Sequence, residues 1–376
     1  MEELTVAHVS DTHLGKRQYK SELRRKDFTK AFREVVEKII EREDDIDVLI
    51  HSGDLFDSPN PSVEAISDCI EIFSMLEDTD IDVLGIVGNH ERKRGQQWMD
   101  IVNKFENVER LGKEPVEYDG VNIYGIDAIR KHSWDSTDIS LEGDDDKFNI
   151  VCMHELVSPP VPGHMADYEL ENVLDRLGID VDILALGDYH EDETETVSGT
   201  KAIYPGSTEK TKRSESENHS FNLYRIKNGK HKLEKITLDE PRKFLNLERE
   251  VRGNVSDFKK WIDSYDEQMK NNPVVVIQLK GEENGMNQSE IEDYVKKMGA
   301  SIVKVIDERG ISEIDGEDVE DIDNTMIEEE MDSFISEMEI STETKEIENI
   351  IRDEEIPNNR IRDEVRETIK GDKNED

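Results

Sequence analysis

The chain has few cysteines, few aromatic residues and no long apolar run. Its 376 residues include 2 cysteines, and aromatic side chains make up only 6% of them. Cys69 and Cys152 stand in apolar surroundings without a CxxC or zinc-type spacing, which predicts two buried thiols in a reducing cytoplasm. No apolar stretch approaches the roughly 18–20 residues that span a bilayer, and strand-like sequence begins at Leu4, so we expect a soluble protein that is not secreted.

Positive charge is scarce as well. The sequence holds 48 lysines and arginines against 91 acidic residues, which gives a formal net charge of −43. This excludes a nucleic-acid or membrane binder that works by bulk positive charge. Because the excess extends over the whole chain, we interpret it as a solvated surface adapted to molar salt, where the Debye length is about 3 Å. An acidic interaction tail is the alternative for residues 311–376 alone, which carry 25 acidic and 7 basic residues.

The apolar residues that are present alternate between strand and helix patterns. From Phe28 to Ile40 they recur at steps of three and four residues, which is one face of a helix, and the stripes at 66–76 and 98–105 predict two more. Alternating strands and helices are typical of an α/β layered domain. The predicted strands are 4–9, 47–52, 82–87, 121–126, 148–153 and 182–186, followed by a β-rich stretch to about 238 with a hairpin turn at Asn228-Gly229.

A chain of this length exceeds what one hydrophobic core usually serves, so we expect a large first domain and a smaller second unit. Pro241 marks the predicted boundary. After it, three strand patterns alternate with two helix patterns, one of them expected from Val255 to Met269, which suffices for a small α+β domain. The predicted organisation is a first domain at 1–240, a small domain at 241–309, an acidic linker at 310–323 and short apolar helices at 324–371 that dock on a partner.

Metal-binding residue types follow five of the predicted strands. Ligands from the carboxyl ends of separate strands converge on one rim of an α/β sheet. A lone Asp-x-His more often forms a turn, but such residues at five strand ends are not expected by chance. An oxygen-rich set with a few imidazoles suits Mn²⁺ or Fe²⁺, and the number of candidates predicts a pair of ions for phosphoryl chemistry. The motifs are Asp11-Thr12-His13, Gly53-Asp54, Gly88-Asn89-His90, His154-Glu155 and Gly187-Asp188-Tyr189-His190.

These motifs resemble the signature of the calcineurin-like metallophosphoesterases, D-x-H, GD, GNH, H and GHxH. Within that family the chain resembles the DNA double-strand-break repair nucleases of the Mre11/SbcD type, in an archaeal, salt-adapted form. The resemblance is close over residues 4–238 and extends to the next domain by architecture only. It implies a layered metallophosphoesterase β-sandwich flanked by helices, a small α+β cap domain that faces DNA and a helical C-terminal tail. The further residues that carry it are Leu14-Gly15, Arg17-Gln18-Tyr19, Leu55-Phe56, Glu91 and, most specific, Tyr204-Pro205-Gly206-Ser207-Thr208-Glu209.

The resemblance also implies a role for each candidate site residue. His90 would be the general acid near the leaving oxygen rather than a ligand, a task for which imidazole is suited near neutral pH. Two Mn²⁺ ions per chain would be held by the other residues. Asp11, His13 and His190 would bind the first ion, Asn89 and His154 the second, and Asp54 would bridge the two.

One position departs from the family pattern. Asp188 stands where the family usually has histidine. As a ligand of the second ion it would add a third carboxylate and favour harder ions, and the alternative is a residue outside the ligand shell. Three further residues are predicted to be structural, namely Asp57 in a turn and His8 and His51 on buried strands.

The scarce basic residues gather beside the motifs. Three clusters near the active rim predict contacts to the phosphate backbone of a polyanionic substrate, and ion pairs with nearby acids are the alternative. The predicted contacts are Lys16, Arg17, Arg92, Lys93, Lys210, Lys212 and Arg213, and Lys20, Arg24, Arg25, Lys26 and Arg94 belong to the same clusters.

By resemblance, the chain is expected to be a Mn²⁺-dependent DNA nuclease. The expected activities are a 3′-to-5′ exonuclease on duplex DNA and an endonuclease near single strands, which process ends in double-strand-break repair. The resemblance further implies a homodimer through the helices near 62–77 and 95–105, and a tail that grips the coiled-coil base of an SbcC/Rad50-type ATPase. Two alternatives remain: a phosphodiesterase for small substrates, or a nuclease-weak scaffold for the ATPase.

Overall fold

The computed structural model describes residues 3–93, 95–102, 107–143, 147–252, 255–282 and 285–309. The contacts divide the chain into one unit from Met1 to Arg309 and a second from Gly310 to Asp376. The predicted linker at 310–323 and docking helices at 324–371 lie outside the described residues. Among the described residues, no helix has the length and apolar character needed to cross a bilayer.

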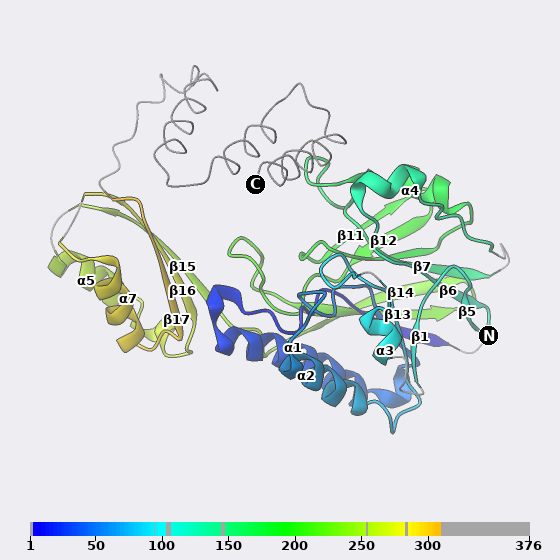
Figure 1. Cartoon of the computed structure of the whole chain (residues 1–376), viewed down its shortest axis with the longest axis horizontal. Helices are drawn as coiled ribbons and strands as arrows, with labels where there is room; N and C mark the ends of the chain where they lie inside the picture. Colours follow the sequence, from blue (N-terminus) through cyan, green and yellow to red (C-terminus); the bar gives the residue numbers. More distant parts are fainter. Residues whose placement is uncertain are drawn as a thin grey trace, which may run out of the picture. The chain divides into compact units, whose positions relative to one another are not determined.

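The first sheet has six strands, and its centre is parallel (Figure 1). Strand β1 pairs parallel with β2 and antiparallel with β13. All residues of β1 and β2 are buried, because protein covers both faces of the sheet. In spatial order the strands are β14 (Lys230–Thr237), β13 (Ser220–Lys227), β1 (Leu4–Val9), β2 (Val48–His51), β3 (Asp82–Gly85) and β4 (Val108–Arg110).

The second sheet also has six strands, with β7 and β10 at its centre. Both central strands are completely buried, and they pair in parallel. A separate two-stranded sheet joins β8 (Val157–Ser158) to β9 (Tyr168–Glu169). In spatial order the second sheet consists of β11 (Glu193–Val197), β12 (Thr200–Tyr204), β10 (Ile183–Gly187), β7 (Phe148–His154), β6 (Val121–Ile126) and β5 (Val116–Tyr118).

The two sheets pack face to face around a shared core. Alternate residues of β1 enter different cores, because successive side chains of a strand point to opposite faces. Val6 packs between the sheets, while Ala7 and Val9 pack under the helices α1 (Glu22–Ile40) and α2 (Val63–Ser74). A third core lies under α4 (Leu170–Leu177) on the far side of the second sheet. The expected β-sandwich flanked by helices is confirmed.

Serine side chains cap the N-termini of the two long helices of the first domain. Ser21 accepts a hydrogen bond from the backbone N–H of Arg24, and Ser62 does the same for Ala65, so both long helices start at an N-cap serine. The predicted stripe of α1 is buried as expected. The remaining helical elements are η1 (Gln18–Lys20), η2 (Glu43–Asp45), α3 (Trp98–Val102) and η3 (Lys131–Ser136).

The small domain is a three-stranded parallel sheet whose helices share one core. The prediction of a single helix from Val255 to Met269 is wrong. Two helices occur there, because the hydroxyl of Ser264 bonds back to the Trp261 carbonyl and Tyr265 leaves the helical conformation. The elements are β15 (Phe244–Val251), α5 (Val255–Asp263), α6 (Asp266–Met269), β16 (Val274–Gly281), α7 (Gln288–Lys297) and β17 (Ile302–Asp307).

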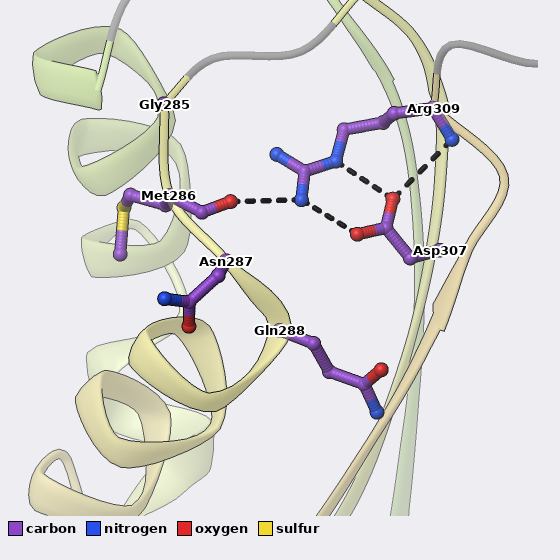
Figure 2. Close-up of a pocket in the computed structure, with 6 residues that line it drawn as sticks. All are labelled: Gly285, Met286, Asn287, Gln288, Asp307 and Arg309. Carbon is purple, nitrogen blue, oxygen red and sulfur yellow. Dashed lines mark hydrogen bonds and ion pairs between the residues drawn. The ribbon is translucent and has the colours of Figure 1, made fainter.

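A hollow at one end of this domain is lined by residues 285–288, Asp307 and Arg309 (Figure 2). The Arg309 guanidinium donates to both oxygens of Asp307 and to the Met286 carbonyl, over distances of 2.6 to 2.9 Å. The Arg309 guanidinium therefore links the end of β17 to the residues just before α7.

Candidate metal centre

The candidate ligands come from the carboxyl ends of strands in both sheets, at one edge of the sandwich. Strands β1, β2 and β3 lead into the first three motifs, and β7 and β10 of the other sheet supply the last two. Because both sheets end at this edge, residues far apart in the sequence become neighbours. The side chains that come together are Asp11, His13, Asp54, His154, Asp188 and His190.

Four of these residues have left-handed backbone conformations. The φ angles are 53° at Asp11, 44° at His13, 56° at Asp54 and 85° at Asp188. Such conformations cost of order 1–3 kcal/mol each and persist where the surroundings fix them. Here the first two motifs bind each other, because the N–H groups of Asp11 and His13 donate to the carbonyls of Gly53 and Asp54 at 3.1 and 3.0 Å. The strain is concentrated at the candidate site.

Glycine permits the close approach of these loops. A Cβ atom on Gly53, whose φ is 97°, would lie 2.6 Å from Nδ1 of His154. A Cβ on Gly88 would lie 2.1 Å from an oxygen of Asp54. The glycines of the two motifs are thus required by the packing of the candidate ligands.

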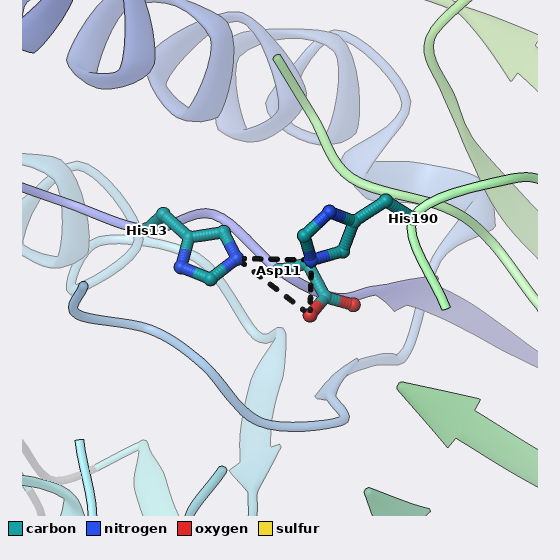
Figure 3. A group of neighbouring side chains, drawn as sticks. All are labelled: Asp11, His13 and His190. Atoms are coloured by element: carbon teal, nitrogen blue, oxygen red, sulfur yellow. Dashed lines mark hydrogen bonds and ion pairs between the residues drawn. The ribbon is translucent and has the colours of Figure 1, made fainter. Parts of the chain in front are cut away.

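The first group of ligand atoms joins Asp11, His13 and His190 (Figure 3). The Nε2 atoms of the two imidazoles are 3.2 Å apart, and they lie 3.9 and 3.6 Å from Oδ1 of Asp11. Asp11 and His13 are buried, and the His190 side chain is 12% exposed. Oδ1 of Asp11 and the Nε2 atoms of His13 and His190 therefore lie close together, as the ligand atoms of one ion would.

The second group joins Asp11, Asp54 and His154. Nε2 of His154 lies 3.5 Å from Oδ2 of Asp54 and 4.0 Å from Oδ1 of Asp11. Oδ2 of Asp54 is also 3.8 Å from Nε2 of His13, so both carboxylates face both groups. The sequence analysis predicted a bridging position for Asp54 alone, whereas the geometry gives Asp11 a shared position too.

Each carboxylate is fixed through one oxygen and free at the other. Oδ2 of Asp11 accepts the backbone N–H of Asp188 at 3.2 Å, and Oδ1 of Asp54 accepts that of His90 at 2.9 Å. Oδ1 of Asp11, Oδ2 of Asp54 and Nε2 of His154 are buried and have no hydrogen-bond partner among the described residues. Buried polar atoms are nearly always paired, so three unpaired acceptors that face each other fit bound cations.

Hydrogen bonds at Nδ1 hold the imidazoles of His154 and His190, whereas Nδ1 of His13 has no hydrogen-bond partner among the described residues. This atom of His154 donates to the Ser52 carbonyl at 2.7 Å, and that of His190 lies 2.8 Å from a carboxylate oxygen of Glu215. Nδ1 of His13 faces the carboxylate of Asp57 at 3.3 Å. Acceptors at Nδ1 leave Nε2 with its lone pair toward the centre, which is the usual arrangement around metal-bound histidines.

The electrostatics of the site favour positive charge. Burial raises the pKa of Asp188, and the neighbouring Asp11 and Asp54 carboxylates raise it further. Burial alone would lower the pKa of His154, but the facing Asp54 and Asp11 carboxylates raise it well above its usual value. Burial also raises the pKa of Glu155 to about 8. The site therefore has a negative potential that divalent cations would offset.

Asp188 and Asn89 face each other at the open side of the site. The Asn89 amide donates to Oδ1 of Asp188 at 3.0 Å, and the same oxygen lies 3.8 Å from Nε2 of His154. The side chain of Asp188 is 21% exposed. Asp188 thus points toward the second group and not away from it.

His90 lies at the mouth of the site. Its side chain is 44% exposed, and its ring meets that of His13 edge-on at 4.9 Å. Nδ1 of His90 is 3.6 Å from Oδ1 of Asp57, and Lys16 holds the same carboxylate at 2.6 Å. Asp57, which we predicted to be a turn residue, therefore contacts both His13 and His90.

The predicted phosphate contacts divide by exposure. Arg17, Arg92, Lys212 and Arg213 are exposed, whereas Lys16 and Lys93 are half-buried. Lys210 is buried, and its ammonium group is paired with Glu217. Arg24 and Arg25 are also buried in ion pairs, and Arg94 lies outside the described residues.

We predicted no place in the site for Glu215, Glu91 or Asp57. The Glu91 carboxylate accepts the backbone N–H groups of Phe56 and Gly88, and so ties the second motif to the third. Its place directly after Gly88-Asn89-His90 is a signal that could have pointed to it. Glu215 has no such signal, because it lies 25 residues from His190 in a loop.

Comparison with known proteins agrees with this geometry. Residues 4–192 match the Calcineurin-like phosphoesterase family. The chain is 34% identical to the DNA double-strand break repair protein Mre11 of Methanosarcina acetivorans, over 96% of the chain and 60% of that protein. It is 31% identical to the protein of the same name from Haloferax volcanii, over 97% of the chain and 81% of that protein.

A solved structure of purple acid phosphatase PPD1 from yellow lupin seeds is 12% identical, with a TM-score of 0.38, and the match covers 60% of this chain and 49% of that one. The chain spans about 60% of the length of the Methanosarcina relatives. Since the family match covers half of the chain and the Haloferax relative is matched over most of its length, the chain belongs to the calcineurin-like phosphoesterase family and, within it, to the Mre11 DNA double-strand break repair proteins.

Proposed function

We propose that the chain is a Mn²⁺-dependent DNA nuclease that processes DNA ends in double-strand-break repair. It acts as a 3′-to-5′ exonuclease on duplex DNA and as an endonuclease near single strands. The names of the relatives support the repair context. The proposal includes a cytoplasmic location, with which the two buried free cysteines agree.

One observation carries the catalytic part of this proposal. Two groups of aspartates and histidines share Asp11, and the facing atoms of Asp11, Asp54 and His154 are buried without a hydrogen-bond partner in the described part of the chain. Carboxylate and imidazole ligands without thiolates suit Mn²⁺. His13 and His190 would hold one ion, Asn89, His154 and Asp188 the other, and the carboxylates of Asp11 and Asp54 would be shared by both.

The protein's own residues position the substrate and a proton. When bound, the two cations supply Lewis acidity toward the phosphodiester and make water more acidic. His90 donates a proton from its Nε2 to the departing oxygen, since its Nδ1 faces Asp57 and its ring is open to solvent. Lys16 keeps the Asp57 carboxylate in place for this task.

Phosphate groups on either side of the cleaved bond meet basic residues. Arg17, Arg92, Lys212 and Arg213 are exposed; the first two follow ligand motifs, and the last two follow Tyr204-Pro205-Gly206-Ser207. In a chain with a net charge of −43, such contacts must be local. We leave Lys210 out of this set, because it is buried and ion-paired.

Two protein partners complete the proposal. Val63 and Ile70 on α2 are 79% and 47% exposed, which supports a homodimer through this helix and the helix near 95–105. An SbcC/Rad50-type ATPase would bind the apolar stripes at 324–371.

A substrate comparison tests the activity. The full chain is incubated with 5′-labelled linear duplex DNA and, separately, with bis-p-nitrophenyl phosphate, each with Mn²⁺ or with EDTA. We expect Mn²⁺-dependent shortening of the duplex, and no shortening by an Asp54→Ala control purified in parallel. Hydrolysis of the small ester alone would favour a small-substrate phosphodiesterase, and activity on neither substrate would favour a scaffold.

A further inference from the structure

A loop segment connects the metal centre to the small domain. This linking segment, residues 207–219, follows β12 and leads into β13. One set of its side chains contacts the candidate ligand His190, and another set contacts the beginning of the small domain. The segment is therefore a place where both parts of the unit meet in side-chain contacts.

On the metal side, Glu215 and Thr211 orient His190. Oε1 of Glu215 lies 2.8 Å from Nδ1 of His190, and the Thr211 hydroxyl donates to the same oxygen at 2.5 Å. The backbone N–H of Thr211 donates to the other oxygen of Glu215 at 2.6 Å. Both oxygens of Glu215 are thus fixed within the segment.

On the other side, a buried ion network fastens the segment. The carboxylate of Glu209 accepts the Arg24 guanidinium at 3.0 Å and the backbone N–H of Arg242 at 2.9 Å. The Arg242 guanidinium in turn donates to both oxygens of Asp27, at 2.6 and 2.7 Å. Arg242 stands at the start of the small domain, so this network joins that domain to α1 and to the segment.

Further contacts reach the sheet of the small domain. Glu217 accepts the backbone N–H of Phe244 at 3.2 Å. Arg213 donates to the side chain of Gln278 at 3.2 Å, and its carbonyl accepts from Asn246 at 3.4 Å. Residues 209, 213 and 217 thus contact the small domain, and residues 211 and 215 between them contact His190. A short segment pinned this closely cannot move at one set of contacts without moving at the other.

We propose that the linking segment makes binding of the ion at His190 depend on the attachment of the small domain. Glu215 is the positioning residue for His190, and Arg242 holds the segment from the side of the small domain. The proposal rests on the metal site of the proposed function. Loss of such an outer partner typically weakens metal binding by about 10–100-fold. Displacing the small domain, for instance by a bound partner, would then weaken one ion selectively.

Calorimetric titration of the full chain with Mn²⁺ tests this proposal, together with thermal unfolding of each variant. In Glu215→Ala one of two ions should bind about 10–100-fold more weakly. In Arg242→Leu the same ion should bind several-fold more weakly, while the other ion is unchanged. Arg252→Ala is the matched control, because this exposed arginine of the small domain pairs with Glu250, two residues away. It should bind both ions as the wild type does.

Equal weakening of both ions in Arg242→Leu, or no weakening of either, would overturn the coupling. If Arg242→Leu does not fold, the double variant Asn246→Ala with Gln278→Ala decides instead, because both side chains are at the surface of the sheet. It should weaken the same ion, and unchanged binding would refute the proposal. A wild type that binds two ions but cuts no DNA would contradict the proposed function and leave the coupling intact.

Discussion

Two clusters of buried charge in the same unit differ in how their atoms are paired. In the metal centre, Asp11, Asp54 and His154 each present a buried atom without a hydrogen-bond partner in the described residues. In the second cluster, which we call the arginine cluster, Arg24, Asp27, Glu209 and Arg242 bind one another through several ion pairs. Arg24 and Glu209 are as deeply buried as the candidate ligands.

This difference in pairing distinguishes a binding site from a cluster of charges that only stabilises the fold. An unpaired buried acceptor costs about 1–3 kcal/mol, and more when charged, so a group of them indicates that something else completes the site. A paired network needs no ligand, and removing one member leaves uncompensated charge. Substitutions in the metal centre should therefore change the number of bound ions, and substitutions in the arginine cluster should change the free energy of unfolding.

The largest expected effect is that of Asp54→Ala. Its free oxygen faces His13 at 3.8 Å and His154 at 3.5 Å, so the variant should lose both ions. Activity should fall by more than about 10⁴-fold, beyond the loss of a proton-transfer group alone. Calorimetry with Mn²⁺ measures the ions directly. Two tight sites in this variant would show that the ligand set is wrong.

Arg24→Met tests the other cluster. Removing the guanidinium leaves Asp27 and Glu209 with unpaired charge, which should lower the free energy of unfolding by about 3–5 kcal/mol. Urea unfolding followed by circular dichroism measures the change. Arg33→Met is the control, because Arg33 pairs with the exposed Glu71, and it should cost about 0–1 kcal/mol. Equal losses in the two variants would contradict the structural role of the arginine cluster.

His90→Ala separates chemistry from ion binding. A general acid contributes about 10²–10⁴ in rate without holding an ion. Turnover should fall by that factor, while Mn²⁺ content and DNA affinity stay near those of the wild type. A metal content that drops by half would instead identify His90 as a ligand.

Asp188 offers a comparison of two substitutions at one position. Its carboxylate oxygen lies 3.8 Å from Nε2 of His154, so Asp188→Ala should lose the second ion and most of the activity. Asp188→His keeps a ligand but removes a negative charge, and zinc or cobalt should compete better against Mn²⁺. Competition titrations with these metals distinguish the variants. Two tight ions and normal turnover in Asp188→Ala would place the residue outside the ligand shell.

Truncation after Asp323 should have the smallest effect on the molecule itself. The unit that ends at Arg309 contains both charge clusters, so unfolding and basal nuclease activity should not change. Co-purification with the ATPase should be lost, because the apolar stripe Ile327, Met331, Phe334, Ile335 and Met338 is removed. An unfolded truncated chain, or one that still binds the ATPase, would contradict the docking role.

Much of the fold follows from local patterns. The hairpin at Asn228-Gly229 joins β13 to β14 as predicted, and the six strands predicted with bounds lie within about two residues of them. The short strands β4 and β5 were not predicted. The break between α5 and α6 was not predicted, because the apolar spacing continues across it. A single hydroxyl, that of Ser264, competes there with the helix.

Most residues of the candidate site could be predicted from the sequence, but several of their contacts could not. Strand ends followed by Asp, His and Asn identify the rim on which they meet, because parallel strands deliver their ends to one edge. Local sequence does not indicate the contact between Asp57 and the two histidines, or that between Glu215 and His190. These residues come from different loops, and no periodicity links them.

Motif order and hydrophobic period are local properties of the chain, so the residue types at the strand ends could be predicted from them. Which atom of each side chain is free depends on how the sheets and loops pack. In Asp11 and in Asp54, one carboxylate oxygen accepts a hydrogen bond from a backbone N–H of another motif. This bond directs the other oxygen to the centre. The structure also decided that Arg24 and Lys210 are interior ion pairs and not exposed phosphate contacts. Burial and partner choice depend on residues distant in the sequence, so they appear only when the sheets and loops have packed.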